Sequence, residues 1–143
     1  MARVAVRRSF DVDVPADEAW RRLAEVERWP EWAPHISGVT VTPAGPLTPA
    51  SSGTLRIRRF GQNTFRMSAW DPPDRWQWTG GLPGVRILYD HAFAPVGDGA
   101  TTTLTWTVSL DGPMAVVVRP VFSRVYGGFA DRAIPRLQQW MLA

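Results

Sequence analysis

The chain has 143 residues, a formal net charge of +3 and no cysteine, so disulfides, thiolate metal sites and cysteine nucleophiles are excluded. Apolar residues make up 45% and charged residues 20%, a balance typical of one globular domain, which we expect to span residues 1–143. The basic residues are all arginine and are spread over nearly every segment. Nucleic-acid-binding proteins usually cluster such residues on one element, so we expect no nucleic-acid partner.

The first third of the chain predicts one strand followed by two short helices. Alternation indicates a half-buried strand at 3–14, with these side chains on its inner side: Val4, Val6, Phe10, Val12 and Val14. Arg8 interrupts the series, and three placements remain open: a strand end, a bulge or an inward-pointing side chain. Pro15 is expected to open the first helix, where its missing N–H costs nothing. The stretch WPEWAPHIS at 29–37 is expected to form the second helix.

The remaining chain predicts six strands and one long helix. The strands are expected at 36–42, 54–60, 64–71, 74–79, 85–94 and 101–110, separated by turn residues. From Gly112 to the end, apolar side chains follow a helical stripe. Pro120 and Pro135 would each delete a helical hydrogen bond, so we expect this helix to be bent or segmented. The glycine-rich stretch at 80–84 is expected to be a mobile loop that gates an entrance.

Four stretches carry a resemblance to a known family. They are VPADEAWRRLAEVERWPEW at 14–32, WDPPDRWQW at 70–78, GVRILYDHAF at 84–93 and DGATTTLTW at 98–106. The chain resembles the START/polyketide-cyclase superfamily (SRPBCC proteins), and is most similar to its bacterial polyketide cyclase/dehydrase branch. The resemblance implies an α+β helix-grip fold, with a seven-stranded antiparallel sheet wrapped around a long C-terminal helix and two short helices between strands one and two. It also implies a hydrophobic cavity between sheet and helix.

Strand alternation together with this fold predicts which side chains face the cavity. The expected ligand-binding residues are Trp32, His35, Arg59, Met67, Trp78, Tyr89, His91, Trp106, Phe122, Tyr126 and Phe129. Trp32 and His35 are expected in the second short helix, near the cavity mouth. Arg59 is either an inward cation for a carboxylate or a strand-end side chain that reaches water. Trp70 has the opposite parity from Met67 and is expected outside.

Tyr89 and His91 share one strand face, and two interpretations of them remain equally open. They are either core residues whose polar tips are hydrogen-bonded, or a pair that orients a ligand and carries acid–base chemistry. If the protein is an enzyme, these two residues are the candidate catalytic groups. The sequence has no paired carboxylates, metal-binding spacing, GxSxG, P-loop or GxGxxG pattern, so we expect no metal and no cofactor.

Three functions follow in order of preference. The first is binding of a small hydrophobic molecule (a lipid, polyketide or aromatic compound), because the eight tryptophans exceed what a core of this size needs. The second is a polyketide aromatase/cyclase-type enzyme that uses His91 and Tyr89. The third is a protein-interaction module. We expect a cytoplasmic protein without a signal peptide and without stable membrane insertion, because no long apolar run occurs. The identity of the ligand and the oligomeric state remain open.

Overall fold

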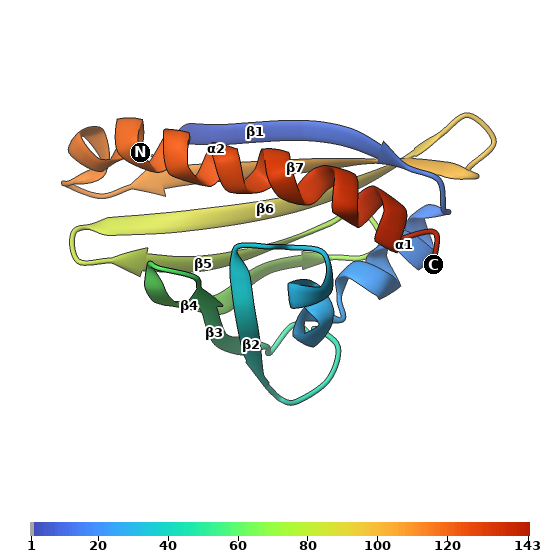
Figure 1. The fold of residues 1–143 in the computed structure, drawn as a ribbon, viewed down its shortest axis with the longest axis horizontal. Coiled ribbons are helices and arrows are strands. Elements are labelled where there is room, and N and C mark those ends of the chain that lie inside the picture. Colours follow the sequence, from blue (N-terminus) through green and yellow to red (C-terminus); the bar gives the residue numbers. More distant parts are fainter. Residues whose placement is uncertain (1) are drawn as a thin grey trace.

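The computed structural model describes residues 2–143 and has ten helices and strands (Figure 1). In chain order they are β1 (Arg3–Val12), α1 (Ala16–Leu23), the 3-10 helix η1 (Val26–Glu31), β2 (Ile36–Thr42), β3 (Ser52–Ile57), β4 (Gly61–Asp71), β5 (Arg75–Leu82), β6 (Val85–Val96), β7 (Thr101–Asp111) and α2 (Ala115–Trp140). The strands form one antiparallel sheet in the order β1-β7-β6-β5-β4-β3-β2. Helix α2 lies along one face of this sheet, which confirms the predicted helix-grip fold.

The core lies between α2, the two short helices and the inner face of the sheet. In β6, five alternating side chains are buried: Val85, Ile87, Tyr89, His91 and Phe93. Their neighbours along the strand point away from the core, which confirms the predicted two-residue period. Such alternation is what an antiparallel sheet with one wet face requires.

The outer face of the sheet carries ion pairs between neighbouring strands. Arg75 of β5 bonds Asp90 of β6 at 2.7 Å, and Arg86 of β6 bonds Asp111 of β7 at 2.8 Å. Asp90 and Arg86 alternate with the buried residues of β6, so their side chains project from the opposite face. The expectation that both residues pair with neighbouring strands is confirmed.

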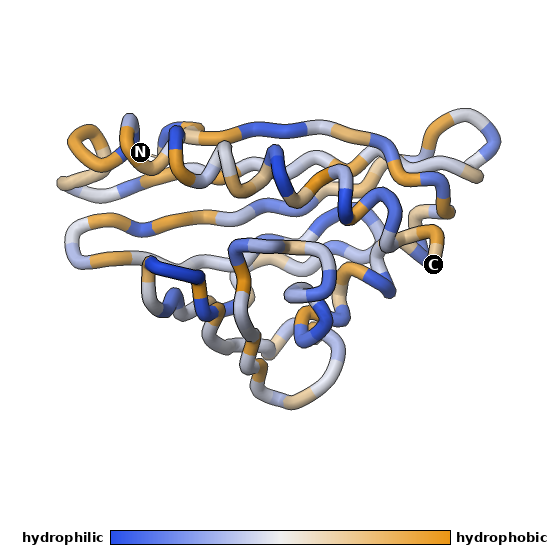
Figure 2. Tube along the Cα trace, in the orientation of Figure 1, coloured by the Kyte–Doolittle hydropathy of each residue, from blue (hydrophilic) through white to orange (hydrophobic). Residues whose placement is uncertain are grey.

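Helix α2 runs as one element through both of its prolines, so it is not segmented. The residues four positions earlier, Val116 and Asp131, are exposed, and their carbonyl groups can therefore bond water instead. Figure 2 shows the start of α2 in the orange of hydrophobic residues. There Val116, Val117 and Val121 are all exposed, so the first turns of α2 present apolar side chains to solvent.

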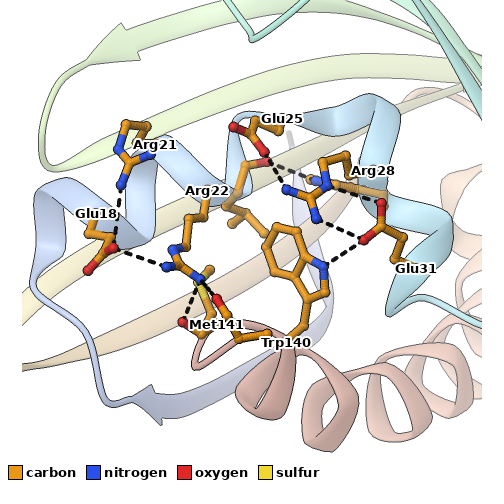
Figure 3. Close-up of polar contacts among 11 residues, drawn as sticks. Glu18, Arg21, Arg22, Glu25, Arg28, Glu31, Trp140 and Met141 are labelled. Carbon is orange, nitrogen blue, oxygen red and sulfur yellow. Dashed lines mark hydrogen bonds and ion pairs between the residues drawn. The ribbon is translucent and has the colours of Figure 1, made fainter.

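Polar contacts fix the C-terminal end of α2 against α1 and η1 (Figure 3). Arg22 donates to the carbonyl oxygen of Met141 at 2.9 Å, and the indole N–H of Trp140 donates to Glu31 at 3.0 Å. The Arg28 guanidinium lies 5.1 Å from the centroid of the Trp140 ring, a cation–π distance. These contacts join the last turn of α2 to the two helices that follow β1.

A β-bulge in β4 changes which side chains face the core. Met67 lies opposite Trp78, but beyond a register shift Trp70 lies opposite Trp76. The extra residue reverses the alternation, so both Met67 and Trp70 face inward. The Trp70 ring packs edge-to-face against Trp20, with centroids 5.1 Å apart. The prediction that Trp70 points outward is therefore wrong.

The structure differs from the prediction at the end of β3 and in the stretch at 80–84. Strand β3 ends at Ile57, so Arg59 lies in the turn before β4 and not on a strand facing inward. The stretch at 80–84 is not a loop, because β5 continues to Leu82, which pairs with Val85 of β6. Only Pro83 and Gly84 form the connection, and Gly84 has a φ of 80° that suits a tight turn.

Candidate functional site

A small space, here called the inner cavity, lies between the sheet and α2 and has a volume of about 40 Å³. It is lined by Trp29, Trp32, His35, Ile36, Leu55, Ile57, Asn63, Trp78, Tyr89, His91, Trp106, Tyr126, Ala130 and Ala133. This volume holds water molecules but no drug-sized ligand. Tryptophan side chains therefore fill most of the space that the fold leaves between its layers.

His91 is buried and surrounded by tryptophan rings. Its ring centroid lies 5.1 Å from that of Trp76, 5.0 Å from Trp78, 5.9 Å from Trp29 and 6.4 Å from Trp106. Burial lowers the pKa of His91 to about 3, against the opposing effect of a backbone hydrogen bond with Trp76. The imidazole is therefore neutral near pH 7. Its Nδ1 atom has no hydrogen-bond partner among the described residues, although a core role would require one.

Tyr89 and Tyr126 contribute two phenol groups from opposite sides of the inner cavity. Their ring centroids are 5.8 Å apart, with Tyr89 on β6 and Tyr126 on α2. Burial raises the pKa of Tyr89, and the neighbouring Tyr126 raises it further. Burial also raises the pKa of Tyr126. Both hydroxyl groups therefore stay protonated near pH 7 and can donate hydrogen bonds to a bound molecule.

A second space, here called the outer chamber, adjoins the inner cavity and has a volume of about 190 Å³. It is lined by His35, Ile57, Phe60, Asn63, Leu82, Ile87, Phe122, Val125, Tyr126 and Phe129. Its walls are largely aromatic: the Phe122 and Tyr126 rings stack with centroids 5.4 Å apart. An apolar cavity of about 150 Å³ is enough to bind benzene in another protein. The outer chamber can therefore hold an aromatic ring or a short acyl segment.

A surface groove continues outward from the outer chamber and has a volume of about 420 Å³. We call it the arginine groove, and it is lined by Pro34, His35, Arg58, Arg59, Phe60, Arg124, Val125, Gly128, Phe129 and Arg132. His35 and Phe129 border both the groove and the chamber, and their rings stack in parallel with centroids 4.5 Å apart. This stacked pair stands at the passage between the surface and the chamber.

His35 and Trp32 do not lie in a helix as predicted. Helix η1 ends at Glu31, and both residues belong to the connection that leads into β2. Burial lowers the pKa of His35 to about 4, and the positive charge of Arg132 lowers it further. His35 is thus neutral near pH 7, which favours its stacking on Phe129 over solvation as a cation.

The structure brings most of the predicted site residues together. Seven line the inner cavity: Trp32, His35, Trp78, Tyr89, His91, Trp106 and Tyr126. Phe122 and Phe129 line the outer chamber, and Arg59 lines the arginine groove. Met67 borders none of these three spaces and packs against the core opposite Trp78.

The sequence interpretation missed several lining residues, of which Asn63 is the most informative. It was expected in a turn, but β4 begins at Gly61, and Asn63 lies opposite Leu55 on the inner face. Its side chain borders both the inner cavity and the outer chamber, where its amide can bond a ligand. Its position two residues before the inward Phe65 was the signal that could have identified it.

The polar groups of the inner cavity and the outer chamber are neutral donors and acceptors. No carboxylate lines the inner cavity, the outer chamber or the arginine groove. Across residues 2–143, no group of three His, Asp or Glu side chains is arranged to hold a metal ion. In the same part of the chain, no helix is both long and apolar enough to cross a bilayer. The arrangement is suited to recognising a largely apolar molecule through a few hydrogen bonds.

Comparison with known proteins identifies the family. A family model described as polyketide cyclase/dehydrase and lipid transport matches residues 3–139. No curated protein sequence matches significantly. Among solved structures, the Zhui aromatase/cyclase from Streptomyces sp. R1128 aligns with a TM-score of 0.78 at 17% identity, covering 99% of this chain and 94% of that chain. A START superfamily protein from Mycobacterium smegmatis aligns with a TM-score of 0.70 at 15% identity, covering 95% of each chain.

A third similar structure is norcoclaurine synthase from Thalictrum flavum, with a TM-score of 0.73 at 11% identity, covering 99% of this chain and 87% of that chain. At such identities, the likeness to solved structures establishes the fold and not the activity. The family match is stronger evidence, because it extends over nearly the whole chain. The protein therefore belongs to the polyketide cyclase/dehydrase and lipid transport family of the START/polyketide-cyclase (SRPBCC) superfamily.

Proposed function

We propose that this protein binds a small hydrophobic molecule, such as a lipid, polyketide or aromatic compound, between the sheet and α2. The observation that carries the proposal is the outer chamber, an aromatic-lined space of about 190 Å³ that continues into a surface groove. Burying apolar ligand surface there contributes roughly 25 cal/mol for each Å² removed from water. A ligand ring in the chamber would be packed against the aromatic side chains of Phe122, Tyr126 and Phe129.

Polar groups around the two spaces would orient the ligand. Tyr126 and Asn63 border both the inner cavity and the outer chamber, so they would contact a ligand at its deepest point. Neither side chain is hydrogen-bonded to another described residue. Each could therefore bond a ligand carbonyl or hydroxyl group without breaking an existing bond, which favours ligands that carry such a group.

A polyketide aromatase/cyclase-type enzyme is the second candidate function. The protonated phenols of Tyr89 and Tyr126 support it, because two donors could stabilise an enolate oxygen. His91 is a poor general base for that reaction, since a pKa of about 3 lies far below the neutral range in which a base is most effective. Binding therefore ranks above catalysis.

Isothermal titration calorimetry with a panel of apolar compounds tests the binding proposal. We expect saturable binding with a negative heat-capacity change, the signature of buried apolar surface. Tyr126→Phe should weaken binding of a flavone by about fivefold to tenfold, because one neutral hydrogen bond contributes about 1 kcal/mol. The matched control is phenylnaphthalene, which has no oxygen and should bind wild type and variant equally. No saturable heat with any compound would contradict the proposal.

A further inference from the structure

The arginine groove concentrates positive charge at the entrance to the outer chamber. Arg58 and Arg59 come from the turn between β3 and β4, while Arg124 and Arg132 come from α2. Four arginines from two elements thus line one groove, and no carboxylate lines it. Like charges that share a surface repel one another, so this arrangement favours an anion between them.

These four arginines lack the acidic partners that several other arginines of the described chain have. Arg8, for example, bonds Asp131 at 2.7 Å, whereas no residue among 2–143 forms an ion pair with any of the four. Arg58 donates its Nε–H to the carbonyl oxygen of Pro34 at 3.0 Å, which orients the guanidinium but adds no negative charge. Asp131 attracts Arg132 at longer range, but its carboxylate is already bonded to Arg8.

The turn holds Arg59 in an unfavourable backbone conformation. Its φ is 71°, and it is the only described residue other than glycine with a positive φ. Asparagine and glycine adopt this conformation at lower cost than arginine does. A disfavoured backbone at a groove edge is an observation that points to a function for the side chain.

The groove and the outer chamber form one continuous site, in which the groove is positively charged and the chamber is apolar. Phe60, Val125 and the stacked pair His35 and Phe129 border both spaces. An elongated ligand could therefore place its apolar part in the chamber and its end among the arginines. A guanidinium group binds carboxylate or phosphate through two parallel hydrogen bonds, which a neutral head group cannot reproduce.

We propose that the natural ligand is an anionic amphiphile, whose carboxylate or phosphate group lies in the arginine groove and whose apolar chain occupies the outer chamber. This inference rests on the proposed binding function and specifies the class of ligand. It assigns the anion to Arg58, Arg59, Arg124 and Arg132. The stacked pair His35 and Phe129 then marks the boundary between the charged and apolar parts of the ligand.

Calorimetry with a matched series of octyl compounds tests the inference. Octanoate and octyl phosphate share their chain with octanol, which is neutral, and with octylammonium, which is cationic. We expect the two anions to bind at least about tenfold more tightly than octanol, and octylammonium to bind more weakly than octanol. High salt should reduce the preference for anions, because it screens exposed charges. Comparing octanoate with octyl phosphate identifies which head group the groove prefers.

Charge-removing variants locate the anion. The double variant Arg59→Asn and Arg124→Gln should lose most of the preference for octanoate while its affinity for octanol is unchanged; asparagine also fits the positive φ of residue 59, so folding is preserved. Arg66→Gln is a control for the loss of positive charge outside the groove, because it removes one charge from the exposed outer side of β4. Equal binding of octanoate and octanol by wild type would overturn this inference but not the binding function. Binding of neither compound, together with no saturable heat across the panel of apolar compounds, would overturn the binding function itself.

Discussion

Val125→Trp is expected to weaken binding of apolar ligands by at least about a hundredfold. Val125 is half-buried on α2 and borders the outer chamber, so an indole at this position would occupy the space that the ligand needs. Excluding a ligand that buries roughly 100 Å² of apolar surface costs about 2.5–3 kcal/mol, which corresponds to this loss of affinity. Titration of the variant with the tightest-binding compound of the panel measures the effect.

The matched control is Val121→Trp, one helical turn earlier. Val121 is 69% exposed and borders neither the chamber nor the groove, so the same substitution should leave affinity unchanged. Circular dichroism and thermal unfolding should show that both variants are folded. Wild-type affinity in Val125→Trp would place the ligand elsewhere and remove the chamber from the account.

The second large effect is expected on acid stability. The pKa values of His91 and His35 are lowered from the ordinary value near 6.5 to about 3 and about 4, mainly by burial. The unfolded chain therefore binds more protons than the native protein at mildly acidic pH. The contribution of these two histidines to the free energy of unfolding should have its full value above pH 6.5. It should decrease as the pH falls from 6.5 towards their lowered pKa values. Between pH 7 and pH 5, His91 should contribute a loss of about 2 kcal/mol, and the partly exposed His35 a smaller loss.

Urea unfolding of wild type and His91→Phe at pH 7, 6 and 5 measures this loss. The window lies above the ordinary pKa values of aspartate and glutamate, so the histidines dominate it. The variant should show a smaller decrease in stability than wild type by about 2 kcal/mol at pH 5. His35→Phe should remove only the smaller share. Identical pH dependence in wild type and His91→Phe would contradict this account. It would show that the pKa of His91 is the same in the native protein as in the unfolded chain, and that water reaches the imidazole despite the surrounding tryptophans.

Much of the fold could be predicted because the physical signal is local and repeated. The alternation in β6 and β7 and the helical stripe from Val118 to Leu137 each reflect one buried face. The same alternation placed Tyr89 and His91 side by side on the inner face. The likeness to a known family supplied the arrangement of these elements, which local pattern does not determine.

The site could be predicted only in part, because its details depend on single residues that break the pattern. The bulge beyond Met67 reverses the alternation and brings Trp70 inward. No residue in this stretch is of a type that indicates a bulge from the sequence. The early end of β3 moves Arg59 from a strand into a turn, and the early start of β4 moves Asn63 from a turn onto a strand. The volume of a cavity depends on how large rings pack together, as around His91, and sequence spacing does not report it.

An amide NMR titration with octanol tests the central claim most directly, because octanol reports on the chamber without engaging the arginines through charge. The account predicts saturable shifts at Leu82, Ile87, Phe122, Tyr126 and Phe129, with little change at Thr40 and Thr54 on the outer side of β2 and β3. Shifts that are absent, or that are centred on the exposed valines at the start of α2, would contradict it. The predicted shifts would place an apolar ligand between the sheet and α2.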